Sequence, residues 1–418
     1  MNTKQIYATL ELADHEVRLI VGEFFNTRFN IFQVVCIPCQ GMSFQGILNT
    51  DQVLDAIQKA LVQINEKLKI KIKAVITTLP SYRFKHLNSK QTVKIEGFDG
   101  SITAKDIQTA IKQAETLKYG DKYVRVQSSI SRYTVNGISS RKPPIGEHCS
   151  QLTVDVDMYY IDKHLAYDVA NIIQQSGLKL MDIFVSGYAI AKEAALIEAS
   201  LNKQIIVIDT QWQTTTLSQI FHGKLQNSVL FQGGLIDIVK PIMDKYHLKE
   251  EVVIELLKYG VEINKEIFSK NPIHMWKNEN NELILLSEEE FMHNILPFIQ
   301  KWIDNIANTC APILKTCDST VIVCGEAGEQ RGFERLLQKR LQVETRSYIP
   351  ETLGGRDAKL STCLGLFYAY QDKLPLYGEI DDSIDVDAFI RQVSFRKTSE
   401  KERREDTLTN RLKSMFTK

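Results

Sequence analysis

The chain has 418 residues, of which 44% are hydrophobic and 24% are charged, so it can bury a large core and is expected to form several compact units. Basic and acidic residues are balanced at 51 each, which excludes a protein that coats nucleic acid through its net charge. The seven scattered cysteines are typical of a reducing compartment rather than of a secreted disulfide framework. Because no apolar run approaches the ~18 residues of a membrane span, we expect a soluble, cytoplasmic protein.

The first 80 residues are predicted to begin with three strands, followed by a helix and a fourth strand. Two β-rich runs surround the polar sequence from Ala13 to Glu16, which predicts a hairpin. Apolar residues then recur with helical spacing after Thr50, which we expect to cap the helix. In chain order, these elements are expected at 6–12, 17–24, 30–37, 51–69 and 72–79.

Residues 81–162 are predicted to form a separate small α/β unit, with strands at 91–95, 123–133 and 151–160, a helix at 104–118 capped by Thr103, and a loop at 137–146. After this unit the opening pattern of three strands and a helix recurs. A duplicated unit with an insert in its first copy predicts two related α/β halves that face each other across a cleft. The later elements are expected as helices at 163–176, 188–199, 235–268, 287–310, 332–341 and 359–369, and as strands at 180–185, 204–209, 214–221, 223–232 and 320–324.

The C-terminus is dominated by charged residues. Residues 379–387 hold five acids and no base, whereas residues 391–418 hold nine bases and four acids. The last twelve residues have helical apolar spacing with basic flanks, which is typical of an amphipathic helix that lies in a membrane surface. The alternatives are a frayed helix that packs on its own domain and a disordered end. The residues predicted to form the membrane anchor are Leu408, Arg411, Leu412, Lys413, Met415 and Phe416.

An ordered set of short motifs resembles the FtsA family of actin-like bacterial cell-division proteins. The similarity extends from about residue 5 to 370, and the tail at 405–418 also fits. No single motif is specific, but their order is. The motifs are YATLEL at 7–12, VRLIVGE at 17–23, TTLP at 77–80, ISRYTVNG at 130–137, PPIG at 143–146 and VSGYAIA at 185–191.

This resemblance implies an actin-like α/β fold with two ribonuclease-H-like halves, an inserted small α/β subdomain and a C-terminal amphipathic helix. It implies the following division of the chain: a first actin-like domain (1–80 and 163–200), the inserted subdomain (81–162), a second actin-like domain (201–235 and 319–371), its smaller subdomain (236–318), a charged linker (372–404) and a membrane-targeting helix (405–418).

The resemblance also implies a function. An FtsA-like protein polymerises and tethers FtsZ filaments to the cytoplasmic face of the membrane, as a peripheral protein of the mid-cell division ring. The implied partners are the FtsZ C-terminal tail on 236–318, further copies of the chain, other division proteins through 81–162 and an anionic membrane surface, but no nucleic acid. Two alternatives stay open: a pilus-assembly actin-like protein of the PilM type, which generally lacks the membrane helix, and a small-molecule kinase of the actin superfamily, which would need intact phosphate loops.

The phosphate loops depart from the family pattern. An actin-type site needs an aspartate for the water shell of the metal, and glycines that let backbone N–H groups reach the phosphates. The first loop should read Asp-x-Gly-Thr/Ser-x-Lys, but here the carboxylates of Glu11, Asp14 and Glu16 occupy it. At ~4 Å and an effective dielectric of ~20, each added carboxylate would repel a phosphate charge by roughly 4 kcal/mol.

The second and third loops are also altered. Residues 211–213 are Gln, Trp and Gln in place of glycines, and residues 326–327 are Glu and Ala. Three readings stay open: a pocket that binds nothing, weak or modified binding of ATP with magnesium, and a true ATPase. We expect no ATP hydrolysis and assign no catalytic residue and no metal ligand. The candidate nucleotide-binding residues are Glu11, Asp209, Thr214, Thr215, Gly234, Lys258, Gly325 and Gly328.

Overall fold

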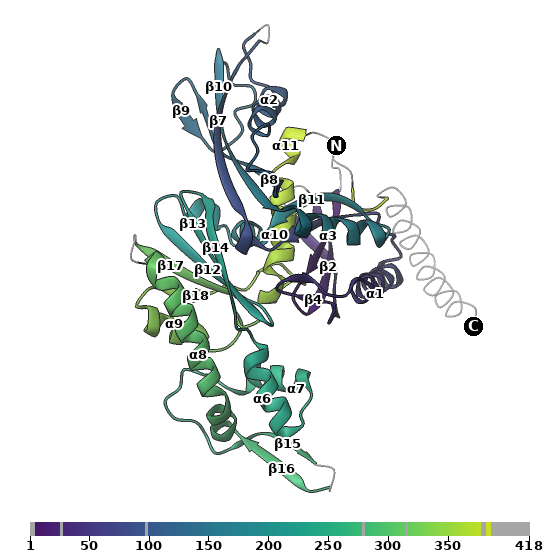
Figure 1. Ribbon diagram of the computed structural model, residues 1–418, viewed down its shortest axis with the longest axis vertical. Helices are drawn as coiled ribbons and strands as arrows, with labels where there is room; N and C mark the ends of the chain where they lie inside the picture. The colour runs from purple at the N-terminus through teal and green to yellow at the C-terminus, as the bar shows by residue number, and fades with distance from the viewer. Residues whose placement is uncertain are drawn as a thin grey trace, which may run out of the picture.

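A computed structural model of the protein describes residues 5–25, 28–96, 99–277, 281–314, 317–377 and 382–385. Its two halves each contain a five-stranded mixed sheet, and a third sheet belongs to the inserted unit (Figure 1). None of the helices in these ranges combines the length and the apolar composition needed to cross a membrane.

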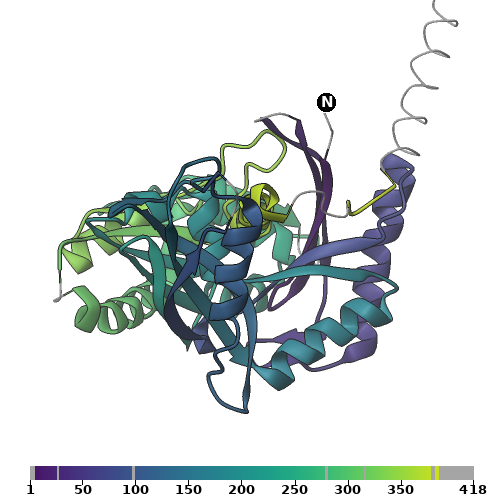
Figure 2. The same ribbon diagram turned by 90° about the horizontal axis from the view of Figure 1, so that it is seen from above.

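The sheet of the first half has the strand order β11-β6-β1-β2-β3. Strands β1, β2 and β3 form an antiparallel meander, and β6 and β11 add in parallel to β1. Helices α1 and α3 pack side by side on one face (Figure 2), and α4 packs on α10. The bounds are β1 Gln5–Leu12, β2 Glu16–Phe25, β3 Arg28–Pro38, β4 Met42–Ser43, β5 Gly46–Ile47, α1 Thr50–Leu68, β6 Ala74–Leu79, α3 Lys163–Gln175, β11 Lys179–Val185, α4 Ser186–Glu193, α5 Leu196–Ala199, η3 Ala358–Leu360 and α10 Ser361–Gln371.

The sheet of the second half repeats this topology in the order β18-β17-β12-β13-β14. Again three antiparallel strands come first, and two parallel strands complete the sheet. The predicted duplication is therefore confirmed by strand order and direction. The bounds are β12 Gln204–Thr210, β13 Thr214–Phe221, β14 Lys224–Gln232, α6 Ile236–Tyr246, α7 Glu250–Glu255, η2 Leu256–Gly260, β15 Pro272–Lys277, β16 Leu283–Ser287, α8 Glu288–Leu314, β17 Ser319–Gly325, α9 Phe333–Leu341 and β18 Thr345–Ser347.

The inserted unit lies between β6 and α3 in the chain and has its own core. Its sheet has the order β7-β10-β8-β9, and α2 packs on it. The predicted cap of α2 is present, because Thr103 and Asp106 form a reciprocal capping box. The bounds are η1 Ser81–Arg83, β7 Lys85–Lys94, α2 Ala104–Ala114, β8 Tyr123–Val135, β9 Ile138–Ser140 and β10 Gln151–Asp162.

Three local predictions are wrong. Helix α1 is capped by Asn49, whose side chain accepts a hydrogen bond from the Gln52 N–H, and not by Thr50. Short strand β9 lies inside the predicted loop at 137–146, because it continues the hairpin from β8. The helices expected over 235–268 end at Gly260, and the unpredicted hairpin of β15 and β16 follows.

The predicted linker at 372–404 begins too early. Residues 374–377 form α11 (Leu374–Tyr377), and the side chain of Leu376 is buried in the core of the inserted unit. Farther along, Ser383 and Ile384 are buried against the first half. A charged composition predicted solvent exposure here, but the few apolar residues within the run are enough to hold the segment on the fold.

Candidate functional site

The two phosphate loops of the sequence analysis face each other across the cleft and are bonded to each other directly. The backbone N–H of Gln213 donates to Asp14 Oδ2 at 2.7 Å, and Gln213 Nε2 donates to the Asp14 carbonyl at 2.9 Å. The hydroxyl of Thr214 donates to the same carboxylate at 3.3 Å. The His15 ring stacks on Trp212, with ring centroids 5.1 Å apart. The loop side chains thus fill the gap between the loops.

Arg18, on β2, lies at the centre of this contact with only 1% of its side chain exposed. Its guanidinium donates to Glu16 Oε1 at 2.6 Å, to Glu326 Oε1 at 2.5 Å and to Glu11 Oε2 at 3.4 Å. It also donates to the Lys359 carbonyl at 2.8 Å. A buried guanidinium is stable only with such a set of acceptors. Because Glu326 comes from the second half, Arg18 links the two halves.

The charges of this cluster compensate one another. Lys359 Nζ lies 3.0 Å from Glu16 Oε1 and adds a second cation. Burial alone would raise the pKa of Glu16, but the charges of Arg18 and Lys359 outweigh it and lower the pKa to about 2. For Glu11, burial dominates over Arg18 and raises the pKa above its usual value. The two cations therefore face the Glu16 carboxylate, which is firmly ionised, and the Glu11 carboxyl, which tends to keep its proton.

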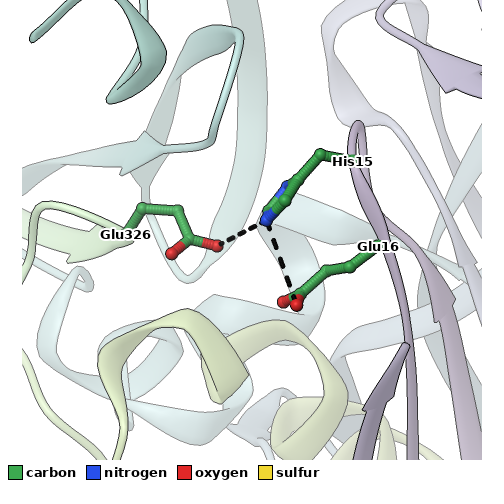
Figure 3. A group of neighbouring side chains, drawn as sticks. All are labelled: His15, Glu16 and Glu326. Carbon is green, nitrogen blue, oxygen red and sulfur yellow. Dashed lines mark ion pairs between the residues drawn. The ribbon is translucent and has the colours of Figure 1, made fainter. Parts of the chain in front are cut away.

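His15, Glu16 and Glu326 point toward one another (Figure 3), and one ligand atom from each lies within 4.8 Å of the others. His15 Nε2 is 3.8 Å from Glu326 Oε1 and 3.9 Å from Glu16 Oε2. This spacing could suit a metal ion, but both carboxylates already bind the Arg18 guanidinium. A divalent ion would have to share its ligands with that cation, and the repulsion disfavours it. The group fits an ion-pair network better than a magnesium site.

The candidate residues at the end of β12 are occupied by protein contacts. Asp209 is buried, burial raises the pKa of its carboxyl to about 7, and Gln211 Nε2 donates to it at 2.8 Å. Thr215 donates to the Gly233 carbonyl at 2.7 Å and accepts from Trp302 Nε1 at 2.8 Å.

The candidate glycines allow close contact between protein segments. A Cβ on Gly325, whose φ is +80°, would lie 2.2 Å from the Thr210 carbonyl oxygen, and a Cβ on Gly234 would lie 2.4 Å from the Trp212 carbonyl oxygen. A Cβ on Gly328 would lie 2.8 Å from the Cβ of Ala358. These close approaches explain the glycines without a phosphate.

Lys258, expected at the adenosine side, forms a bridge within the protein. Its Nζ is 3.1 Å from Glu329 Oε2, and Glu329 Oε1 accepts the backbone N–H of Ala358 at 2.9 Å. Burial would lower the pKa of Lys258, but Asp357 and Glu329 outweigh it and raise the pKa. The amine therefore stays charged and paired.

A small cavity of about 90 Å³ lies beside these loops, lined among others by Glu11, Asp14, Asp209, Thr214 and Tyr82. Ligand pockets usually measure about 300–1,000 Å³, so this cavity is too small for ATP. The residues of the site therefore do not fit a magnesium nucleotide in this conformation. Of the candidate residues, Glu11, Asp209 and Thr214 line this cavity. Gly325 lies against Asp209 and Thr210, whereas Gly328 lies against Cys324 and Ala358.

Arg18 was not among the predicted site residues. The acids of the first loop were expected to face phosphate, but Glu11 and Glu16 face this guanidinium instead. The hairpin register could have indicated this contact, because Glu11 on β1 is the direct cross-strand partner of Arg18 on β2. The predicted membrane-anchor residues from Leu408 to Phe416 lie outside the described residues, so they stay a prediction.

No family model matches the chain. Among curated proteins, the cell division protein FtsA of Bacillus subtilis (strain 168) is 20% identical over 373 residues, covering 88% of this chain and 83% of that protein. FtsA of Enterococcus hirae is 21% identical over 368 residues, covering 86% and 82%. FtsA of Neisseria meningitidis serogroup B is 21% identical over 396 residues, covering 88% and 91%.

Solved structures show the same fold. The PilM-PilN type IV pilus biogenesis complex aligns with a TM-score of 0.54 at 13% identity, covering 89% of this chain and 98% of that chain. MreB5 of Spiroplasma citri bound to ADP aligns with a TM-score of 0.50 at 12% identity, covering 90% and 99%. The resemblance to FtsA and the actin-like fold are both confirmed.

Proposed function

We propose that the protein acts in bacterial cell division, where it polymerises and tethers FtsZ filaments to the cytoplasmic face of the membrane. The observation that carries this proposal is the similarity to curated proteins named FtsA, which extends over 88% of the chain for the Bacillus subtilis protein. A fluorescent fusion to the intact chain tests it. A mid-cell ring supports the division role, whereas polar or envelope foci without a ring contradict it.

The structural likeness to PilM favours a second candidate, a pilus-assembly role, because PilM shares the fold over 89% of this chain. The localisation experiment separates the two functions, since polar foci are the expected pattern for pilus assembly. Loss of pili without a division defect, on deletion of the gene, would also favour the second candidate. The sequence similarity favours division, because the three curated relatives compared above are all named FtsA.

We propose the groove between α6 and α8 as the docking site for the FtsZ tail. The groove encloses about 500 Å³ and is lined by Phe298, Trp302, Lys240 and Lys301, among others. Phe298 is 37% exposed, and a half-exposed aromatic beside lysines is a suitable anchor for a peptide. A titration with the FtsZ C-terminal peptide tests this site.

For Phe298→Asp we expect binding of the peptide to weaken at least tenfold, because the aromatic anchor is lost. Tyr259→Asp is the matched control, since Tyr259 is an exposed aromatic in the same subdomain and is absent from the lining of the groove. Equal weakening by both variants, or by neither, would contradict this docking site.

We further propose that the Arg18 cluster replaces the magnesium nucleotide as the link between the halves, and that the protein does not hydrolyse ATP. The direct bonds between the loops and the small cavity support this proposal. A phosphate-release assay with the pure chain should stay at the background rate. Steady turnover that disappears on Asp209→Asn would contradict it.

A further inference from the structure

The chain remains attached to the first half well beyond α10. Asp372 pairs with Lys192 at 2.7 Å, and Lys373 pairs with Asp182 at 2.5 Å. Leu376 of α11 then packs into the core of the inserted unit, and its carbonyl accepts a hydrogen bond from Gln108. These contacts hold the chain on the fold as far as α11, which ends at Tyr377.

Residues 382–385 fill the place where β1 and β6 diverge. These strands pair directly only at Thr9 with Ile76 and Leu10 with Thr77. Ser383, which is fully buried, bonds to both of them. Its N–H donates to the Ile6 carbonyl at 3.1 Å, its hydroxyl accepts the Ala8 N–H at 2.8 Å, and its carbonyl accepts the Lys73 N–H at 2.8 Å. We call residues 382–385 the tail clamp.

Four lysines alternate with apolar residues next to the clamp: Lys67, Lys69, Lys71 and Lys73. The intervening Ile70 and Ile72 are buried, whereas the four lysines are exposed. We call these lysines the lysine ridge. In Figure 2 the last described segment, in yellow, ends beside the purple helix α1, whose last turn contains Lys67.

The ridge keeps positive charge that the clamp does not neutralise. Asp385 lies 3.8 Å from Lys73, and the carboxylate of Asp382 accepts the backbone N–H of Ile6 at 3.1 Å. Within the part of the chain that the structure describes, no ion pair is recorded for Lys67, Lys69 or Lys71. Among the described residues, their ammonium groups therefore have no carboxylate partner and can meet an external anion.

We propose that the lysine ridge faces the membrane and binds anionic lipid headgroups. The tail clamp sets the orientation of the first half toward the membrane, because it holds residues 382–385 beside the ridge. This inference rests on the proposed membrane tethering. A cationic residue near an anionic bilayer contributes about fivefold to binding, and several such charges on one short segment act together with the tail. The groove between α6 and α8 belongs to the other half of the molecule, so an FtsZ tail could bind there while the ridge faces lipid.

The test is co-sedimentation of the full chain with vesicles of phosphatidylcholine containing phosphatidylglycerol, compared with pure phosphatidylcholine. The variant is Lys67→Glu with Lys71→Glu. The matched control is Lys270→Glu with Lys277→Glu, which makes the same change of charge on exposed residues of the β15–β16 region. Thermal melts establish that each variant is folded. We expect the ridge variant to bind the anionic vesicles at least tenfold more weakly than the control.

The outcomes separate the two levels of the account. If the unmodified chain does not bind anionic vesicles, the membrane role and the ridge proposal both fail. If it binds and the ridge variant binds equally well, only the ridge proposal fails. A short DNA duplex forms a further arm at the same salt concentration. Loss of duplex binding in the ridge variant with unchanged vesicle binding would identify a nucleic-acid surface and overturn the lipid assignment.

Discussion

Replacing Arg18 by methionine should destabilise the protein more than any other single change in the cleft. The methionine keeps most of the volume but removes the cation that binds Glu16, Glu326 and Glu11. Breaking a buried ion pair by removing one partner costs about 3–5 kcal/mol. Here the guanidinium leaves several acceptors behind, so we expect the upper part of that range in urea unfolding at pH 7.

The pH dependence of this loss has a defined sign. The pKa of Glu16 lies at about 2 in the folded protein, against an ordinary value of 4.5. A lowered carboxyl pKa contributes stability that is fully present above about 4.5 and is lost as the pH falls toward about 2. The difference between the Arg18→Met variant and the unmodified chain should therefore narrow over this interval.

A rescue variant makes the argument specific. Adding Glu16→Gln and Glu326→Gln to Arg18→Met removes the carboxylates that the methionine leaves unpaired, so most of the lost stability should return. A loss below about 1 kcal/mol for Arg18→Met alone, which is the range of a surface ion pair, would refute the view that this cluster holds the halves together. The same view would be refuted if the triple variant were no more stable than Arg18→Met alone.

Further substitutions probe the rest of the account. Burial raises the pKa of the Asp209 carboxyl to about 7, so its ionised form destabilises the folded protein above that pH. In thermal melts, Asp209→Asn should therefore stabilise the protein by up to ~4 kcal/mol above pH 7 and have no effect below about pH 4. A variant less stable than the unmodified chain at pH 8 would contradict this. Phe416→Glu should release the chain from anionic vesicles as completely as deletion of 405–418, whereas equal pelleting of all forms would place the membrane contact elsewhere. Leu376→Asp should speed amide exchange in α2 at least tenfold while Tyr377→Asp, at an exposed neighbour, should not; equal exchange in both would show that α11 does not hold the insert.

The repeated fold could be predicted because its signals are local and recur. Alternating β-rich runs around polar turns indicated the meanders of both halves, and Thr103, as a cap residue, indicated the start of α2. The helices over 235–268 were extended too far, because Val261 and Ile263 are buried without being helical. Apolar spacing alone cannot distinguish a buried helix from a buried segment that is not helical.

The site was harder to predict, because its decisive contacts join residues far apart in the chain. The unusual acids of the first loop were visible in the sequence, but their partners are Arg18 across the hairpin and Lys359 more than three hundred residues later. Similarly, the acidic composition of 379–387 did not reveal that Ser383 lies between β1 and β6. Such contacts depend on how the halves and the C-terminal segment pack, which no local pattern records.

The central claim is that protein side chains replace the nucleotide between the two halves. A calorimetric titration of the nucleotide-free full chain with ATP and magnesium tests it most directly. The closed loops and the Arg18 cluster predict no saturable binding up to about 1 mM, a binding free energy no better than about −4 kcal/mol. Saturation at submicromolar ATP would show that the cleft opens to a nucleotide, and it would contradict the account.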